Sequence, residues 1–180
     1  MRGGDLDIVG QLDSLRRYAR VLTRDPEAAD DLVQATFLRA QERHATFAEG
    51  ADLRVWLMAI LHNLFIDGRR SERAAQARDQ AWSATRPAFV PPSGEIAARL
   101  AQLRAAFLAL NAEQREALHL VAVEGFSVAE AAEILGVPPG TVMSRVGRAR
   151  AALRAFEDGE KETRSASPLR IVGGRDERQD

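Results

Sequence analysis

The 180-residue chain contains no cysteine, so it can form neither a disulfide nor a thiolate nucleophile or zinc ligand. Its three histidines, His44, His62 and His119, lie far apart and lack metal-ligand spacing, so we expect no metal or other cofactor. The sequence has no run of about 18 apolar residues and no amino-terminal secretory signal pattern. We therefore expect a cytoplasmic protein without membrane insertion.

Apolar residues make up 46% of the chain, enough to build real cores. They recur at helical spacing, which predicts an all-α fold. This periodicity fades near the middle of the chain, where Pro87, Pro91 and Pro92 indicate a flexible linker. We predict a helical domain, a linker, a second helical domain and a disordered, charged tail, at residues 8–73, 74–93, 94–157 and 158–180.

The first domain is predicted to be a bundle of three or four helices. Its first helix ends near Thr23, and the apolar face of that helix consists of Ile8, Leu12, Leu15, Ala19 and Leu22. A second helix follows, because Asp25 is a good N-cap and Pro26 suits the first helical position. A third helix is expected from near Asp52 to about Arg70.

The second domain is predicted to contain four helices. The first of these has an apolar stripe formed by Leu100, Leu103, Phe107 and Leu110. The next begins at a capping box made by Asn111 and Gln114. Both helices should support the two that follow.

Those last two helices lie in the segment EGFSVAEAAEILGVPPGTVMSRVGRAR, from Glu124 to Arg150. Ser127 and Glu130 form a capping box that starts the first helix, and Gly136 ends it with a tight turn. The core-facing residues of the second helix are Val142, Val146, Ala149 and Leu153. This pattern predicts a helix-turn-helix for the DNA major groove. The alternative is an arginine-rich, solvated helix on a helical bundle.

The opposite side of the second of these helices is basic, with four arginines and no acid between Pro139 and Ala155. Its candidate contacts with duplex DNA, which we name the duplex face, are Thr141, Ser144, Arg145 and Arg148. DNA-binding chains normally gain nonspecific affinity by releasing counterions through many basic residues. The net charge here is −1, so we expect weak DNA binding by the isolated chain and reliance on a larger partner.

The second helix of the first domain has an outward side that we name the docking face, formed by Glu27, Asp31, Gln34 and Leu38. An exposed leucine beside ordered charge indicates a protein-binding surface. Single exposed apolar residues are common, however. The residues alone therefore favour a solvated helix with one surface leucine.

The third helix is apolar almost all round, with a polar and basic strand edge formed by His62, Asn63, Arg69 and Arg70. Asn63 can donate to and accept from a base edge, and the two arginines could hold phosphates of a nucleic-acid strand. Taken alone, a core helix with a basic carboxyl-terminal turn explains the same residues, since cations suit that end of the helix dipole.

Three segments together resemble a known family: DPEAADDLVQATFLRA, WLMAILHNLFIDGRR and LNAEQREALHLVAVEGFSVAEAAEILGVPPGTVMSRVGRARAAL. In this order and spacing they resemble regions 2 and 4 of bacterial RNA polymerase sigma factors of the extracytoplasmic-function group, over about residues 10–155. The region 4 segment is similar to the alphaproteobacterial general stress response sigma factors.

The resemblance implies a protein that binds core RNA polymerase, directs it to promoter DNA and helps to open the duplex. The docking face would bind the clamp helices of the largest catalytic subunit. The strand edge would read the −10 element as a single strand, and the duplex face would read the −35 element. No small-molecule substrate is implied.

The resemblance also implies an anti-sigma factor that covers one or both domains until a stress signal arrives. The linker around Arg86 to Pro92 is long enough for the domains to rearrange between a closed, inhibited arrangement and an open one on polymerase. The chain departs from the family pattern at Met143, where a basic residue is usual, at Gly147, where a bulkier one is frequent, and at His62. Base assignments are not carried over at these positions.

Other classes of protein fit the sequence less well. A stand-alone dimeric helix-turn-helix regulator should show a dimerisation helix or a ligand pocket, and neither is evident. A sigma-like adaptor or decoy would lose the arginines of the recognition helix, which are present here. An enzyme is the least favoured class, because no carboxylate pair, nucleophile with a base or metal cluster stands out.

Overall fold

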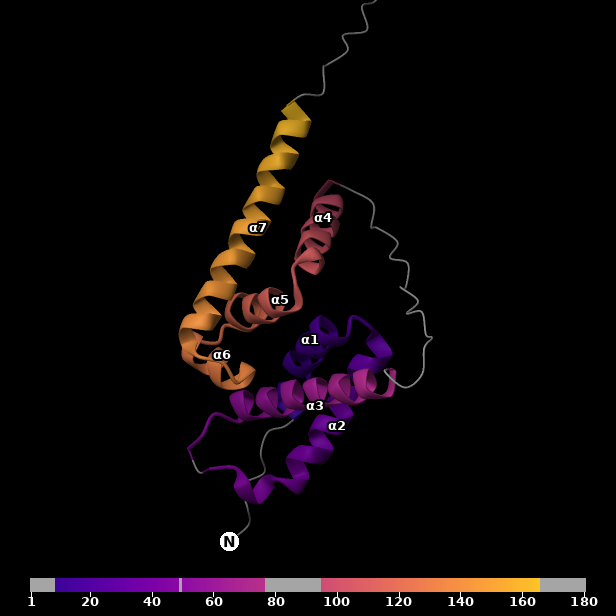
Figure 1. The fold of residues 1–180 in the computed structure, drawn as a ribbon, viewed down its shortest axis with the longest axis vertical. Helices are drawn as coiled ribbons and strands as arrows, with labels where there is room; N and C mark the ends of the chain where they lie inside the picture. Colours follow the sequence, from indigo (N-terminus) through magenta and orange to yellow (C-terminus); the bar gives the residue numbers. More distant parts are fainter. Residues whose placement is uncertain (1–8, 49, 77–94, 166–180) are drawn as a thin grey trace, which may run out of the picture.

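The computed structural model describes residues 9–48, 50–76 and 95–165, and within these ranges it contains helices and no strand (Figure 1). The long helices, in chain order, are α1 Leu12–Thr23, α2 Pro26–Glu42, α3 Leu53–Gln76, α4 Glu95–Ala109, α5 Ala112–Leu118, α6 Val128–Leu135 and α7 Pro139–Ser165. Short 3₁₀ turns lie at Val9–Gln11 and His44–Thr46, and a π-helical turn at His119–Val123 follows α5. The predicted all-α fold is confirmed.

The first domain packs α1, α2 and α3 against one another. Asp25 caps α2 as predicted, since its side chain accepts hydrogen bonds from the backbone N–H groups of Glu27 and Ala28. Arg24 ends α1 in the left-handed conformation, with φ 61°. The apolar residues that fill this domain include Leu15, Tyr18, Leu22, Val33, Leu57, Met58 and Leu61.

The second domain contains the predicted helix-turn-helix in α6 and α7. Both hydrogen bonds of the capping box are present, between the side chain and backbone of Ser127 and those of Glu130. Gly136 ends α6 with φ 63°, a conformation that costs glycine little. Val142, Val146 and Ala149 are buried and hold α7 to the rest of the domain.

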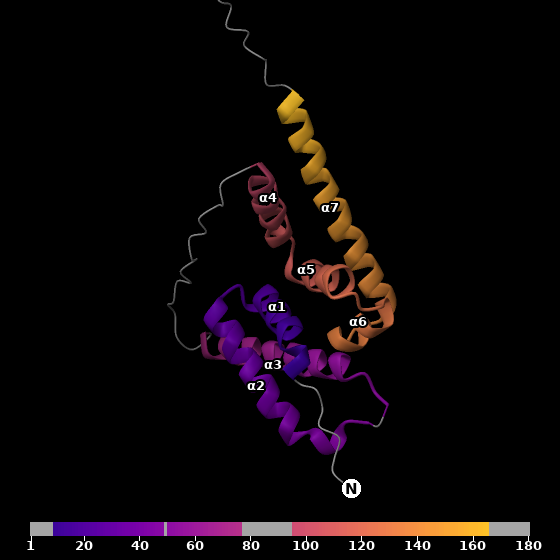
Figure 2. The same ribbon diagram turned by 180° about the vertical axis from the view of Figure 1, so that it is seen from behind.

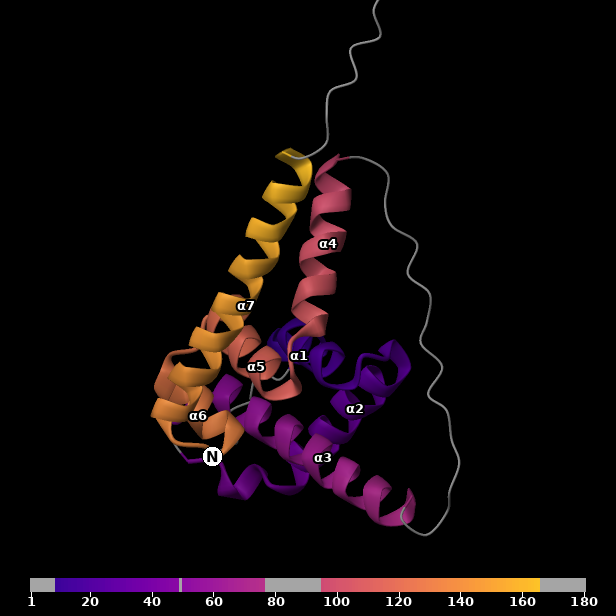
Figure 3. The same cartoon turned by 45° about the horizontal axis from the view of Figure 1, so that its top comes forward.

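The structure differs from the sequence prediction along α4. Leu100 is 64% exposed and Leu103 is 42% exposed, although helical spacing predicted them as part of the supporting stripe. The reason is that α4 extends upward beside α7, away from the bundle (Figure 3). Burial occurs near its carboxyl end, at Ala106 in the last turn and at Leu110, which follows the helix.

Two helix ends also lie beyond the predicted boundaries. Helix α3 continues to Gln76, into the predicted linker, and α7 continues to Ser165, beyond the predicted end of the second domain at residue 157. The remainder of the predicted linker, residues 77–94, and of the predicted tail, residues 166–180, lie outside the described residues.

The two domains pack directly against each other. Helix α6 lies on α3, and α5 lies on α1, as the front and back views both show (Figures 1 and 2). The buried apolar residues of both domains form one continuous cluster. The chain is therefore in a closed arrangement, in which elements of the first domain cover part of the second.

Candidate nucleic-acid interface and the contact between domains

The duplex face occupies the first turns of α7. Ser144 and Arg148 are exposed, Thr141 is half-buried, and the Ser144 hydroxyl donates to the Thr141 carbonyl at 2.9 Å. Arg145 is only 17% exposed, because its Nη2 lies 2.9 Å from Oε2 of Glu113 in α5. The structure thus leaves Ser144 and Arg148 free to meet DNA, while Arg145 would first have to leave Glu113.

Gly147 lies on the same exposed side of α7, and a Cβ placed there would meet no atom within 4 Å. Packing within the chain therefore does not require glycine at this position. A residue without a side chain at this point of α7 lets the helix backbone approach a groove closely.

The docking face lies on the outward side of α2. Glu27, Asp31, Gln34 and Leu38 are all exposed, Leu38 to 63%. The opposite side of the helix is buried through Ala29, Val33, Thr36 and Ala40. The exposed leucine that the sequence predicted is present, beside two carboxylates.

The strand edge is split by the structure. Asn63, Arg69 and Arg70 are exposed on α3, but His62 is only 6% exposed. His62 and Arg69 share a stripe of the helix because they are seven residues apart. Tyr18 of α1 covers that stripe at His62 and not at Arg69, since the Tyr18 hydroxyl lies 3.0 Å from Nδ1 of His62. In the closed arrangement His62 is therefore not part of the exposed edge.

Burial, with a smaller effect of the positive charge of Arg145, lowers the pKa of His62 to about 4. His62 is consequently neutral at pH 7. In this arrangement His62 is a neutral core residue that packs against Tyr18. A DNA contact by His62 would require the chain to open.

Glu124 forms the main polar contact between the two domains. It follows the π-helical turn, whose defining bond runs from the Glu124 N–H to the carbonyl of His119 at 3.0 Å. In an α-helix, residues five apart point about 140° away from each other. The wider turn brings His119 and Glu124 to the same side, where Nε2 of His119 is 3.3 Å from Oε1 of Glu124.

The Glu124 carboxylate enters a socket in the first domain, which we define as Ser14, Arg17 and Arg54. Arg17 donates from Nε to Oε1 at 2.8 Å and from Nη2 to Oε2 at 3.0 Å. The Ser14 hydroxyl and Nη2 of Arg54 both donate to Oε2. Arg54 also donates to the Ser14 oxygen, from Nε at 3.1 Å and from Nη2 at 3.0 Å, so the socket is bonded internally.

Two neighbours of Glu124 complete this contact. Gly125 has φ 75°, a conformation that glycine adopts at little cost, and Phe126 follows it into the interface at 5% exposure. The guanidinium carbon of Arg54 lies 4.3 Å from the centre of the Phe126 ring. Arg54 is therefore held to the second domain by a carboxylate and by an aromatic face.

The hydrogen-bond donors of the socket keep the Glu124 carboxylate ionised. Burial would raise the pKa of Glu124, but hydrogen bonds from Arg17, Ser14 and Arg54 outweigh that effect and lower the pKa to about 2. Burial lowers the pKa of His119 to about 4, although Glu124 pulls the other way. At neutral pH an ionised carboxylate thus sits between two arginines, beside a neutral imidazole.

Tyr18 links the same two domains through its ring. The ring stacks on His119 of the second domain, with centroids 5.8 Å apart and planes at 10°. It also lies 6.3 Å from the His62 ring at 18°. Tyr18 is fully buried between the two imidazoles, which raises its pKa well above the usual value.

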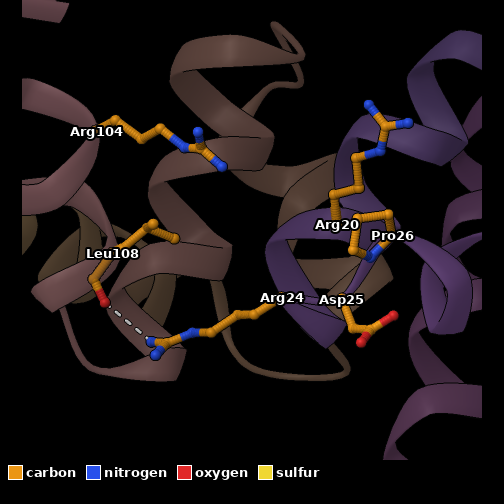
Figure 4. A pocket seen from close by; sticks show the side chains of 6 residues that line it. All are labelled: Arg20, Arg24, Asp25, Pro26, Arg104 and Leu108. Atoms are coloured by element: carbon orange, nitrogen blue, oxygen red, sulfur yellow. Dashed lines mark hydrogen bonds between the residues drawn. The ribbon is translucent and has the colours of Figure 1, made fainter. Parts of the chain in front are cut away.

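A second polar seam joins the domains at the far end of α1. Nη2 of Arg24 donates to the carbonyl of Leu108 in α4 at 2.9 Å, and Nε of Arg115 in α5 donates to the carbonyl of Val21 at 3.3 Å. Figure 4 shows the small pocket at this seam, which is lined by Arg20, Arg24, Asp25, Pro26, Arg104 and Leu108. Both of these bonds run from an arginine to a backbone carbonyl.

The socket could not be predicted from sequence patterns. Glu124 and its partners are 70 to 110 positions apart, so no local spacing connects them. The one usable signal is the triplet Glu124, Gly125 and Phe126 before the capping box, which places an acid and an aromatic residue in a turn. Among the described residues, no group of His, Asp and Glu side chains is arranged to hold a metal ion, and no helix is long and apolar enough to cross a bilayer.

Comparison with known proteins identifies the family. Residues 8–62 match the family model described as the Sigma2 domain of PhyR, and residues 95–153 match the model of Sigma-70, region 4. The chain is 38% identical over 172 residues to the ECF RNA polymerase sigma factor EcfG of Rhodopseudomonas palustris (strain TIE-1), covering 93% of this chain and 94% of that protein. The chain belongs to the extracytoplasmic-function (ECF) sigma factors. The resemblance found in the sequence is confirmed, and the family is not a class of enzymes.

Other sigma factors share both domains with this one. The ECF sigma factor SigC of Mycobacterium tuberculosis is 38% identical over 135 residues, which cover 73% of this chain and 71% of that protein. Among solved structures, the sigma factor RpoE in complex with the anti-sigma factor NepR from Bartonella quintana matches with a TM-score of 0.71 and 33% identity, over 84% of this chain and 94% of that one. CnrH in complex with the cytosolic domain of CnrY matches with a TM-score of 0.60 and 30% identity, over 85% and 86%.

Proposed function

We propose that this ECF sigma factor docks on core RNA polymerase through the docking face, reads the −35 element through the duplex face, and reads the −10 strand through the exposed part of the strand edge. The family membership, established by identity across both domains, carries the first part of this proposal. The exposure of Leu38, Asn63 and Arg148 supports the assignment of surfaces, because each side chain can reach a partner without unfolding the chain.

The chain's own partner in repression is proposed to be a small anti-sigma protein of the NepR kind. The RpoE relative from Bartonella quintana was solved with NepR, and so was the PhyR sigma-like protein from Sphingomonas sp. Fr1, which is 26% identical over 96% of this chain with a TM-score of 0.56. Similarity to EcfG supports a role in a stress response. We place the protein in the cytoplasm, where polymerase and promoter DNA are found, and assign it no catalytic activity of its own.

Run-off transcription with purified core RNA polymerase tests the proposal. With this chain added, we expect a transcript with one defined start from a cognate promoter, and none from core enzyme alone. Adding a NepR-type protein should suppress that transcript. Tight binding of the isolated chain to duplex DNA as a symmetric dimer, with no effect on core enzyme, would instead identify a stand-alone regulator.

A further inference from the structure

The closed arrangement brings the two DNA-reading parts of the chain together. Helix α6, the first helix of the helix-turn-helix, lies against α3, which bears the strand edge, and α7 follows α6 directly (Figure 1). The positive charge of Arg145 in the duplex face adds to burial in lowering the pKa of His62 in the strand edge. The domains that carry the two surfaces are thus packed against each other through α3 and α6.

Promoter DNA requires the opposite arrangement. The −35 and −10 positions are about 25 base pairs apart, roughly 85 Å at 3.4 Å per base pair. Domains held together by packing of α6 on α3 cannot contact two sites so far apart on a duplex. On the function proposed above, the contact between α3 and α6 must break before the chain can hold both elements.

The Glu124 carboxylate holds the two domains together. The Glu124 side chain is fully buried and bonded to three side chains of the other domain, with a bidentate arginine among them. Bidentate arginine–carboxylate pairs are directional and stronger than neutral hydrogen bonds. At the seam, the bonds of Arg24 and Arg115 across the domains go to backbone carbonyls, which are neutral acceptors. The stacked ring of Tyr18 contributes packing.

We propose that Glu124 acts as an intramolecular latch, whose insertion into the socket of Ser14, Arg17 and Arg54 keeps the free sigma factor closed and unable to read both promoter elements. The latch needs no anti-sigma factor. An anti-sigma factor that prefers the closed arrangement therefore selects a state the chain already populates, and polymerase must withdraw Glu124 from the socket when it engages both domains.

The strength of the latch is set by how well water replaces the hydrogen-bond partners of Glu124 when the domains separate. Once the domains separate, water replaces the protein groups around Glu124, Arg17 and Arg54, so only the net value of the charged hydrogen bonds is lost. That net value corresponds to a bias of roughly tenfold to hundredfold toward the closed arrangement. A bias of this size holds the free chain closed yet yields to a partner that binds the open form with high affinity.

A distance measurement between the domains tests the latch without using transcription. Because the chain has no cysteine, Ser71→Cys in α3 and Ala151→Cys in α7 provide two exposed sites for spin labels. We expect one short distance for the labelled parent in pulsed electron paramagnetic resonance. Glu124→Gln should add a population at longer distance, with the open-to-closed ratio raised about tenfold.

Two further variants make the measurement decisive. Arg17→Gln removes the bidentate partner from the other domain and should open the chain in the same direction, even if Glu124→Gln proves poorly folded. Glu133→Gln makes the same change of charge at an exposed position of α6 and should keep the parent distance. The latch would be overturned if the labels of the parent were already far apart. It would also be overturned if Glu124→Gln and Arg17→Gln both kept the short distance.

Run-off transcription then separates the latch from the proposed function. At limiting concentration, Glu124→Gln should reach half-maximal transcript at up to about tenfold lower sigma factor than the parent or Glu133→Gln. An opened variant with no such gain would show that closure does not limit promoter use. If the parent supports no transcript while the distances behave as expected, the proposed function fails and the latch stands as a property of the fold.

Discussion

The guanidinium of Arg17 makes a two-point contact with the carboxylate of Glu124, with Nε 2.8 Å from Oε1 and Nη2 3.0 Å from Oε2. Arg17 lies in α1 and is half exposed, whereas the Glu124 side chain is fully buried. The pair spans the two domains, so its geometry reports directly on whether they are together. Removing Arg17 leaves the buried Glu124 carboxylate without its bidentate partner, whereas removing the Glu124 charge leaves only a half-exposed arginine that water can solvate.

Lowering the pH should reduce the contribution of Glu124 to the free energy of unfolding. A carboxyl whose pKa is lowered by folding stabilises the native state above its ordinary pKa of 4.5, and this contribution is lost as pH falls toward its native pKa of about 2. Glu124→Gln resembles the protonated side chain. We therefore expect the parent to be more stable than Glu124→Gln above pH 4.5, by up to about 3 kcal/mol before screening at half-exposed Arg17 reduces it.

Urea unfolding of both proteins between pH 7 and pH 2.5 measures this difference. It should stay constant down to about pH 4.5 and then shrink. The same pair of proteins in a His119→Gln background removes an imidazole that titrates against the same carboxylate, with a native pKa of about 4. A difference that grows as pH falls would contradict an ionised Glu124 in the socket.

Tyr18→Phe should destabilise the chain through His62. The phenol hydroxyl lies 3.0 Å from Nδ1 of His62, and its loss leaves a buried ring nitrogen without that partner. We expect a loss of about 1–3 kcal/mol in the free energy of unfolding, measured with urea. Adding His62→Leu to Tyr18→Phe should recover part of the loss, because no polar atom is then left unpaired. Full additivity of the two changes would refute a direct bond.

Arg148→Ala should weaken use of the −35 element. Arg148 is exposed on the duplex face and, if it contacts guanine in two places, its loss should cost about 1–3 kcal/mol of promoter binding. Run-off transcription from a promoter that depends on the −35 element measures the loss. Arg150→Ala removes a neighbouring exposed arginine outside the duplex face and should have a smaller effect that is similar on all promoters.

Asp31→Ala combined with Leu38→Ala should abolish co-purification with core RNA polymerase while helix content, measured by circular dichroism, stays unchanged. Both residues are exposed on the outward side of α2, so truncating them should leave the core packing intact. The matched control is Glu133→Ala with Leu100→Ala, which also removes one exposed acid and one exposed leucine, from the second domain. If the Asp31→Ala and Leu38→Ala double variant still co-purified with core RNA polymerase, the assignment of the docking face would be wrong.

Local patterns predicted local structure well. The caps at Asp25 and Ser127 and the turn at Gly136 rest on bonds between neighbours in the chain, and these predictions are confirmed. Of the capping box predicted at Asn111 and Gln114, the structure shows the bond from the Gln114 N–H to the Asn111 side chain. The outward position of Leu38 followed from helical periodicity alone.

The contacts between domains could not be predicted in this way. Whether His62 is an exposed strand contact or a buried partner of Tyr18 depends on which helix lies over α3, and no spacing within α3 decides that. The exposed stripe of Leu100 and Leu103 was mistaken for core for the same reason: periodicity identifies an apolar face but not whether another helix covers it. The role of Glu124 could not be predicted because the residues that bind it lie in two helices far away in the sequence.

The π-helical turn at His119–Val123 makes the joint between the two halves sensitive to chain length. Shortening that stretch by a single amino acid would restore ordinary helical phasing and swing the acidic side chain away from its arginines, with every interacting group still encoded. Insertions and deletions there should accordingly uncouple the halves where most point substitutions would not.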